Sequence, residues 1–252
     1  GTSMGAIVAA SVATGWTIEE MQERFRHAFA DRNPLNDYTV PFVSLFSGKR
    51  VTRLLRAAFG EVDIEDLPKP FFCVSANLTR QNADVHRRGK LWHWLRASVS
   101  IPGVLPPVLA SGSVHVDGGV IDNFPVTAMR NIGRGPVVGI DIDTGGELMA
   151  GNDVVESWSA WEFLRRLVWS RGETLPIPSI VRLLLRSALV GSTSRALTDH
   201  TQVDMLVLPA MKDIDLLDWT RFDQVVEAGY GAGIKGLDAT PGEPPAKPPS
   251  LV

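Results

Sequence analysis

The sequence has little cysteine, no long hydrophobic run and no large excess of charge. Its 252 residues include one cysteine, Cys73, so the chain cannot form an internal disulfide. No uninterrupted apolar run reaches the ~20 residues that a membrane-spanning helix requires. The formal net charge of −3 gives no electrostatic reason to expect a nucleic-acid partner. Histidines and carboxylates do not cluster at ligand spacing, so neither a metal site nor another cofactor is predicted.

The composition suits one large globular domain with a substantial core, because 44% of the residues are hydrophobic and 21% are charged. Cys73 is interpreted as part of that core. It lies in the apolar run Phe71-Phe72-Cys73-Val74, where a small buried side chain is favoured over a reactive thiol.

The first five residues, Gly1-Thr2-Ser3-Met4-Gly5, form the G-x-S-x-G pattern of a nucleophile elbow. In such an elbow a strained serine sits between a strand and a helix, and the two glycines avoid Cβ clashes in the sharp bend. The small apolar residues that follow predict a buried helix, whose N-terminus would stabilise negative charge at Ser3. The pattern alone leaves two hypotheses open: Ser3 is a nucleophile, or Ser3 is a helix N-cap.

No strand precedes this motif in the sequence, although a nucleophile elbow needs one. We therefore expect the chain to be a fragment that begins inside a larger protein. Any upstream strand, targeting signal or regulatory domain would lie before Gly1.

Short apolar runs alternate with helical patterns along the chain. The runs that predict interior strands are 70–76, 114–116, 136–142 and 203–209. The segments that predict further helices are 18–30 (opened by a Thr17–Glu20 capping box), 49–59, 91–99, 125–132, 158–170, 177–189 and 220–237. This alternation predicts a three-layer α/β fold with a largely parallel central sheet flanked by helices. We expect the domain to span residues 1–238 and the proline-rich tail, residues 239–252, to be disordered.

Ser3 needs a proton acceptor, and the sequence offers two arrangements. Asp117-Gly118-Gly119 follows the apolar run 114–116, which puts a carboxylate at a strand end beside residues small enough for close backbone approach. A Ser–Asp dyad predicts that the side chains of Ser3 and Asp117 approach hydrogen-bonding distance. Alternatively, Asp117 only caps a turn, or a triad combines Ser3 and Asp117 with His200, the one histidine that follows Asp117.

Several motifs that agree in order along the chain resemble one known family. Besides the elbow and Asp-Gly-Gly, they are FFCVSANLT at 71–79, LW at 91–92, LRASVSIPGVLPP at 95–107, VDGGV at 116–120 and NFP at 123–125. With these motifs the chain resembles the patatin-like phospholipases, and most closely the neuropathy target esterase branch and its bacterial relatives. The resemblance extends from residue 1 to about residue 208.

The resemblance implies a serine lipid acyl hydrolase that cleaves carboxylic ester bonds of phospholipids or lysophospholipids without a metal or other cofactor. It assigns Ser3 as the nucleophile, Asp117 as the general base, Gly1 and Gly5 to the elbow, and Gly118 and Gly119 to the aspartate loop. The expected location is the cytoplasm or the cytoplasmic side of a membrane.

One part of the family pattern is not found in this sequence. The family carries a glycine-rich loop upstream of the elbow whose backbone N–H groups form the oxyanion hole. The domain is therefore expected to lack this loop and its first strand, and the downstream pair Gly145-Gly146 is interpreted as a turn. The missing loop supports an alternative function, a non-catalytic interaction or regulatory domain that keeps the fold.

A lipid substrate implies a membrane surface and an apolar pocket. Residues 158–171 and 180–189 combine large apolar side chains with arginines and are candidates for a bilayer interface. The alternative is that they form ordinary amphipathic helices covering the sheet. The proline-rich apolar loop 101–108 is predicted to line the acyl pocket.

Overall fold

A computed structural model describes residues 1–31, 34–35, 37–40, 43–142, 180–211, 214 and 219–238. Its α-helices are α1 (Met4–Ala13), α2 (Ile18–Phe25), α3 (Lys49–Phe59), α4 (Leu91–Ser98), α5 (Val126–Arg130), α7 (Ile180–Asp199) and α8 (Phe222–Asp238). Its strands are β1 (Cys73–Asn77), β2 (Asn82–His86), β3 (Val108–Ala110), β4 (Ser113–Asp117), β5 (Val138–Ile140) and β6 (Met205–Val207). The short helical turns are η1 (Arg26–Asp31), η2 (Ile64–Asp66), η3 (Gly118–Val120), η4 (His200–Gln202) and η5 (Trp219–Arg221).

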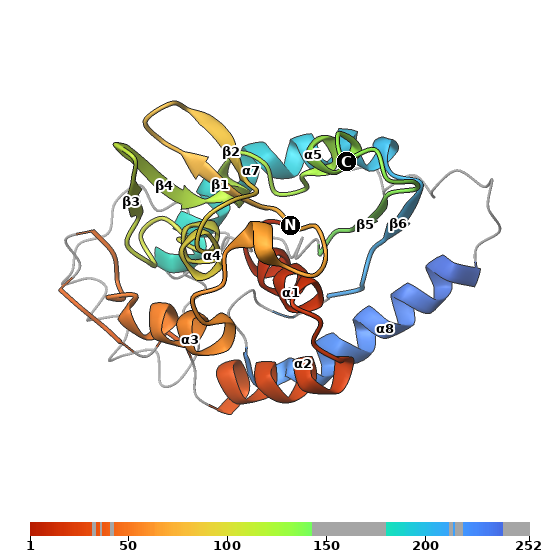
Figure 1. The fold of residues 1–252 in the computed structure, drawn as a ribbon, viewed down its shortest axis with the longest axis horizontal. Coiled ribbons are helices and arrows are strands. Elements are labelled where there is room, and N and C mark those ends of the chain that lie inside the picture. Colours follow the sequence, from red (N-terminus) through yellow and green to blue (C-terminus); the bar gives the residue numbers. More distant parts are fainter. Residues whose placement is uncertain are drawn as a thin grey trace, which may run out of the picture.

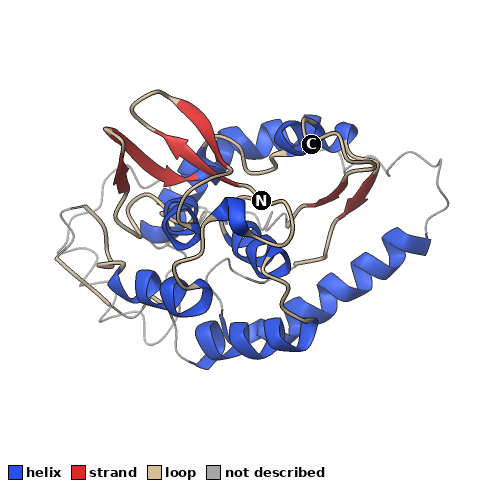
Figure 2. Cartoon of the chain, viewed as in Figure 1, coloured by secondary structure: helices blue, strands red, loops and turns tan. Residues whose placement is uncertain are grey.

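The described strands form two sheets, as Figures 1 and 2 show. One has the strand order β2-β1-β4-β3, and the other pairs β5 with β6. In Figure 1 the N-terminal end, where α1 begins, lies between these two sheets. Gly1 contacts the larger sheet directly, since its nitrogen donates a hydrogen bond to the Phe72 carbonyl and its carbonyl accepts one from the Val74 N–H. This pairing fixes the start of α1 beside β1.

The largely parallel central sheet that the sequence predicts is not confirmed. β1 runs antiparallel to both β2 and β4, and β3 runs antiparallel to β4; only β5 and β6 form a parallel pair among the described strands. For the β1–β2 pair the cause is local, at the end of β1. The Asn77 side-chain oxygen accepts hydrogen bonds from the N–H groups of Thr79 and Arg80, which folds the short connection to β2 into a hairpin.

The strand β3 was not predicted, because prolines crowd the loop just before it. A turn at Ser111 and Gly112 joins β3 to β4, and both residues have positive φ, 50° and 73°. Two-residue hairpin turns prefer this conformation because its twist matches that of the flanking strands. The β3–β4 hairpin sets the direction of β4, the strand that ends at Asp117.

Local sequence signals account for several helices. The predicted capping box is confirmed at the start of α2, where Thr17 Oγ1 accepts from the Glu20 N–H and Glu20 Oε2 accepts from the Thr17 N–H. The helix α3 ends at Gly60, whose φ of 63° suits a glycine. The prediction for residues 18–30 is corrected in one respect, since the α-helix stops at Phe25 and continues as the π-helical turn η1.

The main hydrophobic core joins α1, α3 and α4 and includes part of the loop between α4 and β3. Val104 has no exposed surface and Leu105 is 4% exposed, and both belong to this core. Their side chains therefore contact packed neighbours, and the role of residues 101–108 in an acyl pocket stays a prediction.

Some predicted features lie outside the described residues: the helix 158–170, the Gly145-Gly146 turn and the tail 239–252. The helix predicted for 177–189 is partly described, and α7 continues to Asp199 rather than ending at residue 189. Its hydroxyl-bearing Ser192 contacts the loop after β4, donating a hydrogen bond to the Gly119 carbonyl. The helix α7 thereby packs against the aspartate loop.

Candidate active site

Ser3 lies in the turn that begins α1 and has a strained backbone. Its φ of 51° and ψ of −128° are unusual for a residue other than glycine. Gly1 packs so tightly against this turn that a Cβ there would come within 2.6 Å of the Gly5 carbonyl oxygen. The first glycine of the motif is thus required by close backbone approach, as predicted. Strained non-glycine residues of this kind cluster at functional sites.

The second glycine of the motif does not have the predicted role. Gly5 is exposed in the first turn of α1, and beyond the helix's own backbone a Cβ there would meet nothing within 4 Å. The expectation that both flanking glycines relieve a steric clash is therefore wrong for Gly5.

The Ser3 hydroxyl contacts the carboxylate that the sequence predicted. Ser3 Oγ donates a hydrogen bond of 2.6 Å to Asp117 Oδ2, across 114 positions of sequence. Asp117 ends β4, which pairs with β1, and Thr2 forms a parallel bridge with Val74 of β1. Neighbouring strands thus bring the elbow and the aspartate together. At this distance a carboxylate can accept the proton of a serine hydroxyl.

The loop after Asp117 holds the carboxylate in place. The Gly119 N–H donates a hydrogen bond of 2.8 Å to Asp117 Oδ1, so both carboxylate oxygens have a donor. A Cβ at Gly118 would lie 2.4 Å from the Val74 carbonyl oxygen, and one at Gly119 would lie 2.9 Å from the Leu189 side chain. The two glycines therefore allow η3 to pack directly on β1 and α7.

Burial sets the acidity of Asp117. Its exposed fraction is 3%, and this burial raises the pKa of its carboxyl from the usual 3.8 to about 6. Hydrogen bonds from Ser3 and from the Gly119 N–H oppose the rise. Asp117 is therefore available as a base above about pH 6. Because the folded-state pKa is raised, its contribution to the free energy of unfolding is largest below about pH 4 and is lost as the pH rises through about 6.

Two serines that the sequence analysis did not single out support this pair. Ser98 Oγ accepts a hydrogen bond of 3.0 Å from the Ser3 N–H and donates one of 2.7 Å to the Val74 carbonyl. The Ser100 carbonyl accepts a hydrogen bond of 2.9 Å from the Asp117 N–H. Both serines are fully buried. The two serines lie two positions apart in the otherwise largely apolar stretch 97–104. This placement is the sequence signal that could have identified them, because a buried hydroxyl group requires a specific hydrogen-bond partner.

His200 does not take part in a triad with Ser3 and Asp117. Its Nε2 lies 2.7 Å from Asp141 Oδ2 in a buried pair, and Phe124 packs edge-on against its ring. In the part of the chain that the structure describes, no histidine hydrogen-bonds to Ser3 or Asp117. The alternative hypothesis of a histidine triad is therefore wrong for this structure.

Neither a metal site nor a reactive thiol is found in the described ranges. No group of three or more His, Cys, Asp and Glu side chains there is arranged to hold a metal ion. Cys73 is fully buried, as predicted, and burial raises the pKa of its thiol to about 12. A thiol of this kind is not ionised at neutral pH and is not a nucleophile.

Comparison with known proteins connects this geometry to a family. Residues 1–130 match the family described as patatin-like phospholipase. The chain is 34% identical over 242 residues to an uncharacterized NTE family protein of Mycobacterium tuberculosis, covering 96% of this chain and 41% of that protein. It is 30% identical over 237 residues to lysophospholipase NTE1 of Meyerozyma guilliermondii, covering 91% of this chain and 16% of that protein.

A mammalian protein shows the same relation. The chain is 28% identical over 243 residues to patatin-like phospholipase domain-containing protein 6 of Mus musculus, covering 92% of this chain and 18% of that protein. The chain thus spans less than half the length of each of these relatives. Since the family match covers residues 1–130 and the relatives are NTE proteins, the chain belongs to the patatin-like phospholipase family, in its neuropathy target esterase branch with bacterial relatives.

Proposed function

We propose that residues 1–238 form the catalytic domain of a serine lipid acyl hydrolase that cleaves carboxylic ester bonds of phospholipids or lysophospholipids. The observation that carries this proposal is the 2.6 Å hydrogen bond between Ser3 Oγ, at a strained turn, and the buried carboxylate of Asp117. Membership of a family of lipid hydrolases supports the reaction class. The names of two relatives, a lysophospholipase and a phospholipase domain protein, support the substrate class.

In the first half of the proposed reaction, Ser3 Oγ attacks the ester carbonyl carbon while Asp117 accepts the hydroxyl proton. The tetrahedral intermediate then collapses and the bond from the carbonyl carbon to the alcohol oxygen breaks. Asp117 returns the proton to that oxygen, which leaves as the free alcohol or lysolipid. The acyl group stays on Ser3 as an ester.

In the second half, Asp117 accepts a proton from water while the water oxygen attacks the acyl carbon. The bond to Ser3 Oγ breaks, the fatty acid leaves, and the proton returns to Ser3. The positive end of α1 lies at Ser3 and stabilises the negative charge that develops there in both halves. The Gly119 N–H keeps Asp117 oriented throughout.

We also propose that the protein works at a membrane surface, because its proposed substrates reside there. No helix in the described ranges is both long enough and apolar enough to cross a bilayer. The first candidate interface segment, 158–171, lies outside the described residues. In the second, 180–189, the structure describes the backbone throughout but the side chains only from residue 186 on.

The proposal predicts how the rate of fatty acid release from lysophosphatidylcholine depends on pH, measured with the protein expressed from its complete gene. Because deprotonated Asp117 is the base and burial raises its pKa to about 6, kcat/KM should rise about tenfold per pH unit below pH 6 and level off above it. Activity should persist in EDTA, because no step of the proposed reaction uses a metal.

The matched control for this profile is the Ser3→Ala protein, which should release no fatty acid at any pH. Two results would contradict the proposal: release that does not depend on Ser3, and a folded protein that hydrolyses neither lysophosphatidylcholine nor a short-chain ester.

A further inference from the structure

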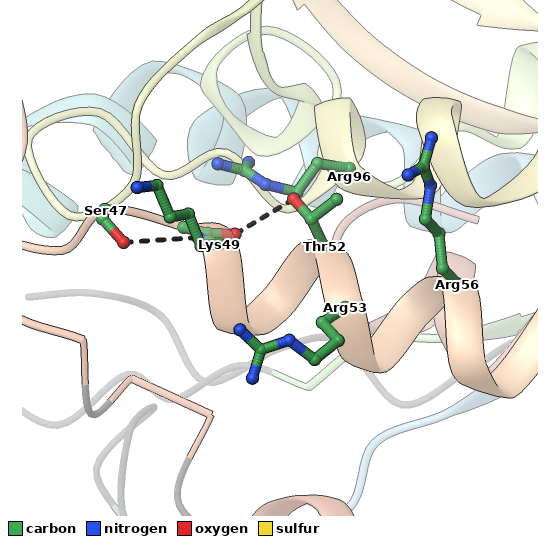
Figure 3. A pocket seen from close by; sticks show the side chains of 7 residues that line it. Ser47, Lys49, Thr52, Arg53, Arg56 and Arg96 are labelled. Carbon is green, nitrogen blue, oxygen red and sulfur yellow. Dashed lines mark hydrogen bonds between the residues drawn. The ribbon is translucent and has the colours of Figure 1, made fainter.

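A second site of concentrated charge lies between α3 and α4 and includes neither Ser3 nor Asp117. It is a cavity of about 380 Å³, and the described residues that line it carry four cationic side chains and no carboxylate. The cations are Lys49, Arg53, Arg56 and Arg96, and the hydroxyl groups of Ser47 and Thr52 lie among them. Figure 3 shows that Lys49, Arg53 and Arg56 come from one helix, α3, while Arg96 reaches in from α4.

Arg96 is the buried member of this group, with an exposed fraction of 6%. Its guanidinium donates to the Ser100 hydroxyl and to the Pro106 carbonyl, which are both neutral acceptors. A guanidinium has five N–H groups, and in the described ranges none of those of Arg96 reaches a carboxylate. A buried cation whose direct hydrogen-bond acceptors are all neutral is costly, so this group favours the arrival of an anion.

The backbone near Arg96 adds to the positive potential. Arg96 lies against the N-terminal end of α3, because a Cβ at Gly48 would come 2.3 Å from Arg96 Nη2. Helix N-termini carry positive partial charge. Burial lowers the pKa of Arg96 only to about 10, so it remains a cation at neutral pH. The carboxylate of Asp37 opposes this shift. Its Oδ2 accepts hydrogen bonds from the Ser47 hydroxyl and the Arg50 N–H, and its Oδ1 is buried without a hydrogen-bond partner among the described residues.

The other cations are poorly neutralised. The side chains of Lys49 and Arg53 are exposed and make no hydrogen bond or ion pair with any described residue. Arg56 lies 3.7 Å from Glu61 and stacks over Trp92 at 3.9 Å from the ring centroid. Lys49 and Arg53 therefore have no carboxylate partner within the described part of the chain, and the direct hydrogen-bond acceptors of Arg96 are neutral.

We propose that this cavity, the α3–α4 basic pocket, binds a phosphate-bearing anion. Planar guanidinium groups, an ammonium and hydroxyl donors around one cavity are the groups that bind phosphate oxygens in proteins. The phosphate comes either from a soluble phosphate compound or from the head group of a phospholipid in a bilayer. The proposal concerns binding alone and holds whether or not Ser3 is the nucleophile.

The variants that test it avoid Arg96, because Arg96 bonds to Ser100 and the Ser100 carbonyl holds the Asp117 N–H. The pocket variant combines Lys49→Ala with Arg53→Ala. The matched control combines Arg88→Ala with Arg134→Ala, which removes the same charge from exposed arginines outside the pocket. Thermal unfolding curves check that both variants keep the stability of the parent protein.

Binding of inorganic phosphate and glycerol 3-phosphate is measured by calorimetry at constant ionic strength. Binding to vesicles of phosphatidylcholine, with and without phosphatidylglycerol, is measured by co-sedimentation. We expect the pocket variant to bind either the soluble phosphates or the vesicles about tenfold or more weakly than the parent protein, while the control variant keeps the affinity of the parent. Weaker binding of inorganic phosphate or glycerol 3-phosphate identifies a soluble phosphate compound as the ligand. Weaker binding of vesicles alone identifies a lipid head group. The proposal is overturned if the parent binds neither probe, or if the pocket variant and the control bind alike.

Discussion

Ester hydrolysis should fall by about 10⁴-fold or more in both Ser3→Ala and Asp117→Asn, and the double mutant should lose little beyond either single mutant. Without the hydroxyl, Asp117 has nothing to deprotonate. Without the carboxylate, the Ser3 hydroxyl that now donates at 2.6 Å stays a weak, protonated nucleophile. The measurement is kcat/KM for lysophosphatidylcholine and for a short-chain ester in the two single mutants and the double mutant.

The matched control for this series is His200→Gln, which keeps a hydrogen-bond donor toward Asp141 and leaves the Ser3–Asp117 pair untouched. It should retain most of the activity if it folds, as judged by circular dichroism. Substantial activity in a folded Asp117→Asn protein, or losses that simply multiply in the double mutant, would rule out a pair that acts as one unit.

Gly118→Ala should destabilise the fold by about 3 kcal/mol and remove activity with it. A Cβ at this position would lie 2.4 Å from the Val74 carbonyl oxygen. The backbones of η3 and β1 would have to separate to relieve this contact, and that movement would displace Asp117. The displaced loop would also lose the hydrogen bond from the Gly119 N–H that orients the carboxylate. Urea unfolding measures the stability, and the rate of ester hydrolysis measures the displacement of Asp117.

Gly5→Ala is the matched comparison, since it adds the same methyl group to the other side of the site. Outside the helix's own backbone nothing lies within 4 Å of a Cβ there, and alanine favours a helix over glycine. The variant should therefore unfold at higher urea, with a gain of roughly 0.5–1 kcal/mol. Equal destabilisation by the two substitutions would mean that the close approach of Gly118 to β1 is not the cause.

Local chemistry made much of this fold predictable from sequence. The Thr17–Glu20 capping box marks the start of a helix through short-range contacts, and it forms as predicted. The contact between Ser3 and Asp117 was predictable for a different reason. Each residue lies in a short motif that alone also fits a helix N-cap or a turn, and the agreement of several motifs with the patatin-like family favoured the pair.

Features that depend on distant partners were not predictable in this way. The continuous apolar run of β1 favoured a parallel interior strand, but the Asx turn at Asn77 makes its connection to β2 an antiparallel hairpin. His200 follows Asp117 in the sequence, which allowed a triad. In the structure, however, His200 pairs with Asp141, which follows β5, whereas Asp117 ends β4. The sequence carries no signal that places the arginines of α3 near Arg96, because their proximity arises only after α3 and α4 have packed together.

Covalent labelling with a fluorophosphonate tests most directly whether Ser3 is a nucleophile activated by Asp117. The protein expressed from its complete gene is treated with the reagent, and intact-mass spectrometry with peptide mapping locates the adduct. We expect one adduct, on Ser3. It should form much more slowly in Asp117→Asn, and in the parent its rate of formation should rise with pH through the Asp117 pKa of about 6. A folded, active protein that carries its adduct on another residue, or labels Ser3 equally fast without the Asp117 carboxylate, would contradict this mechanism.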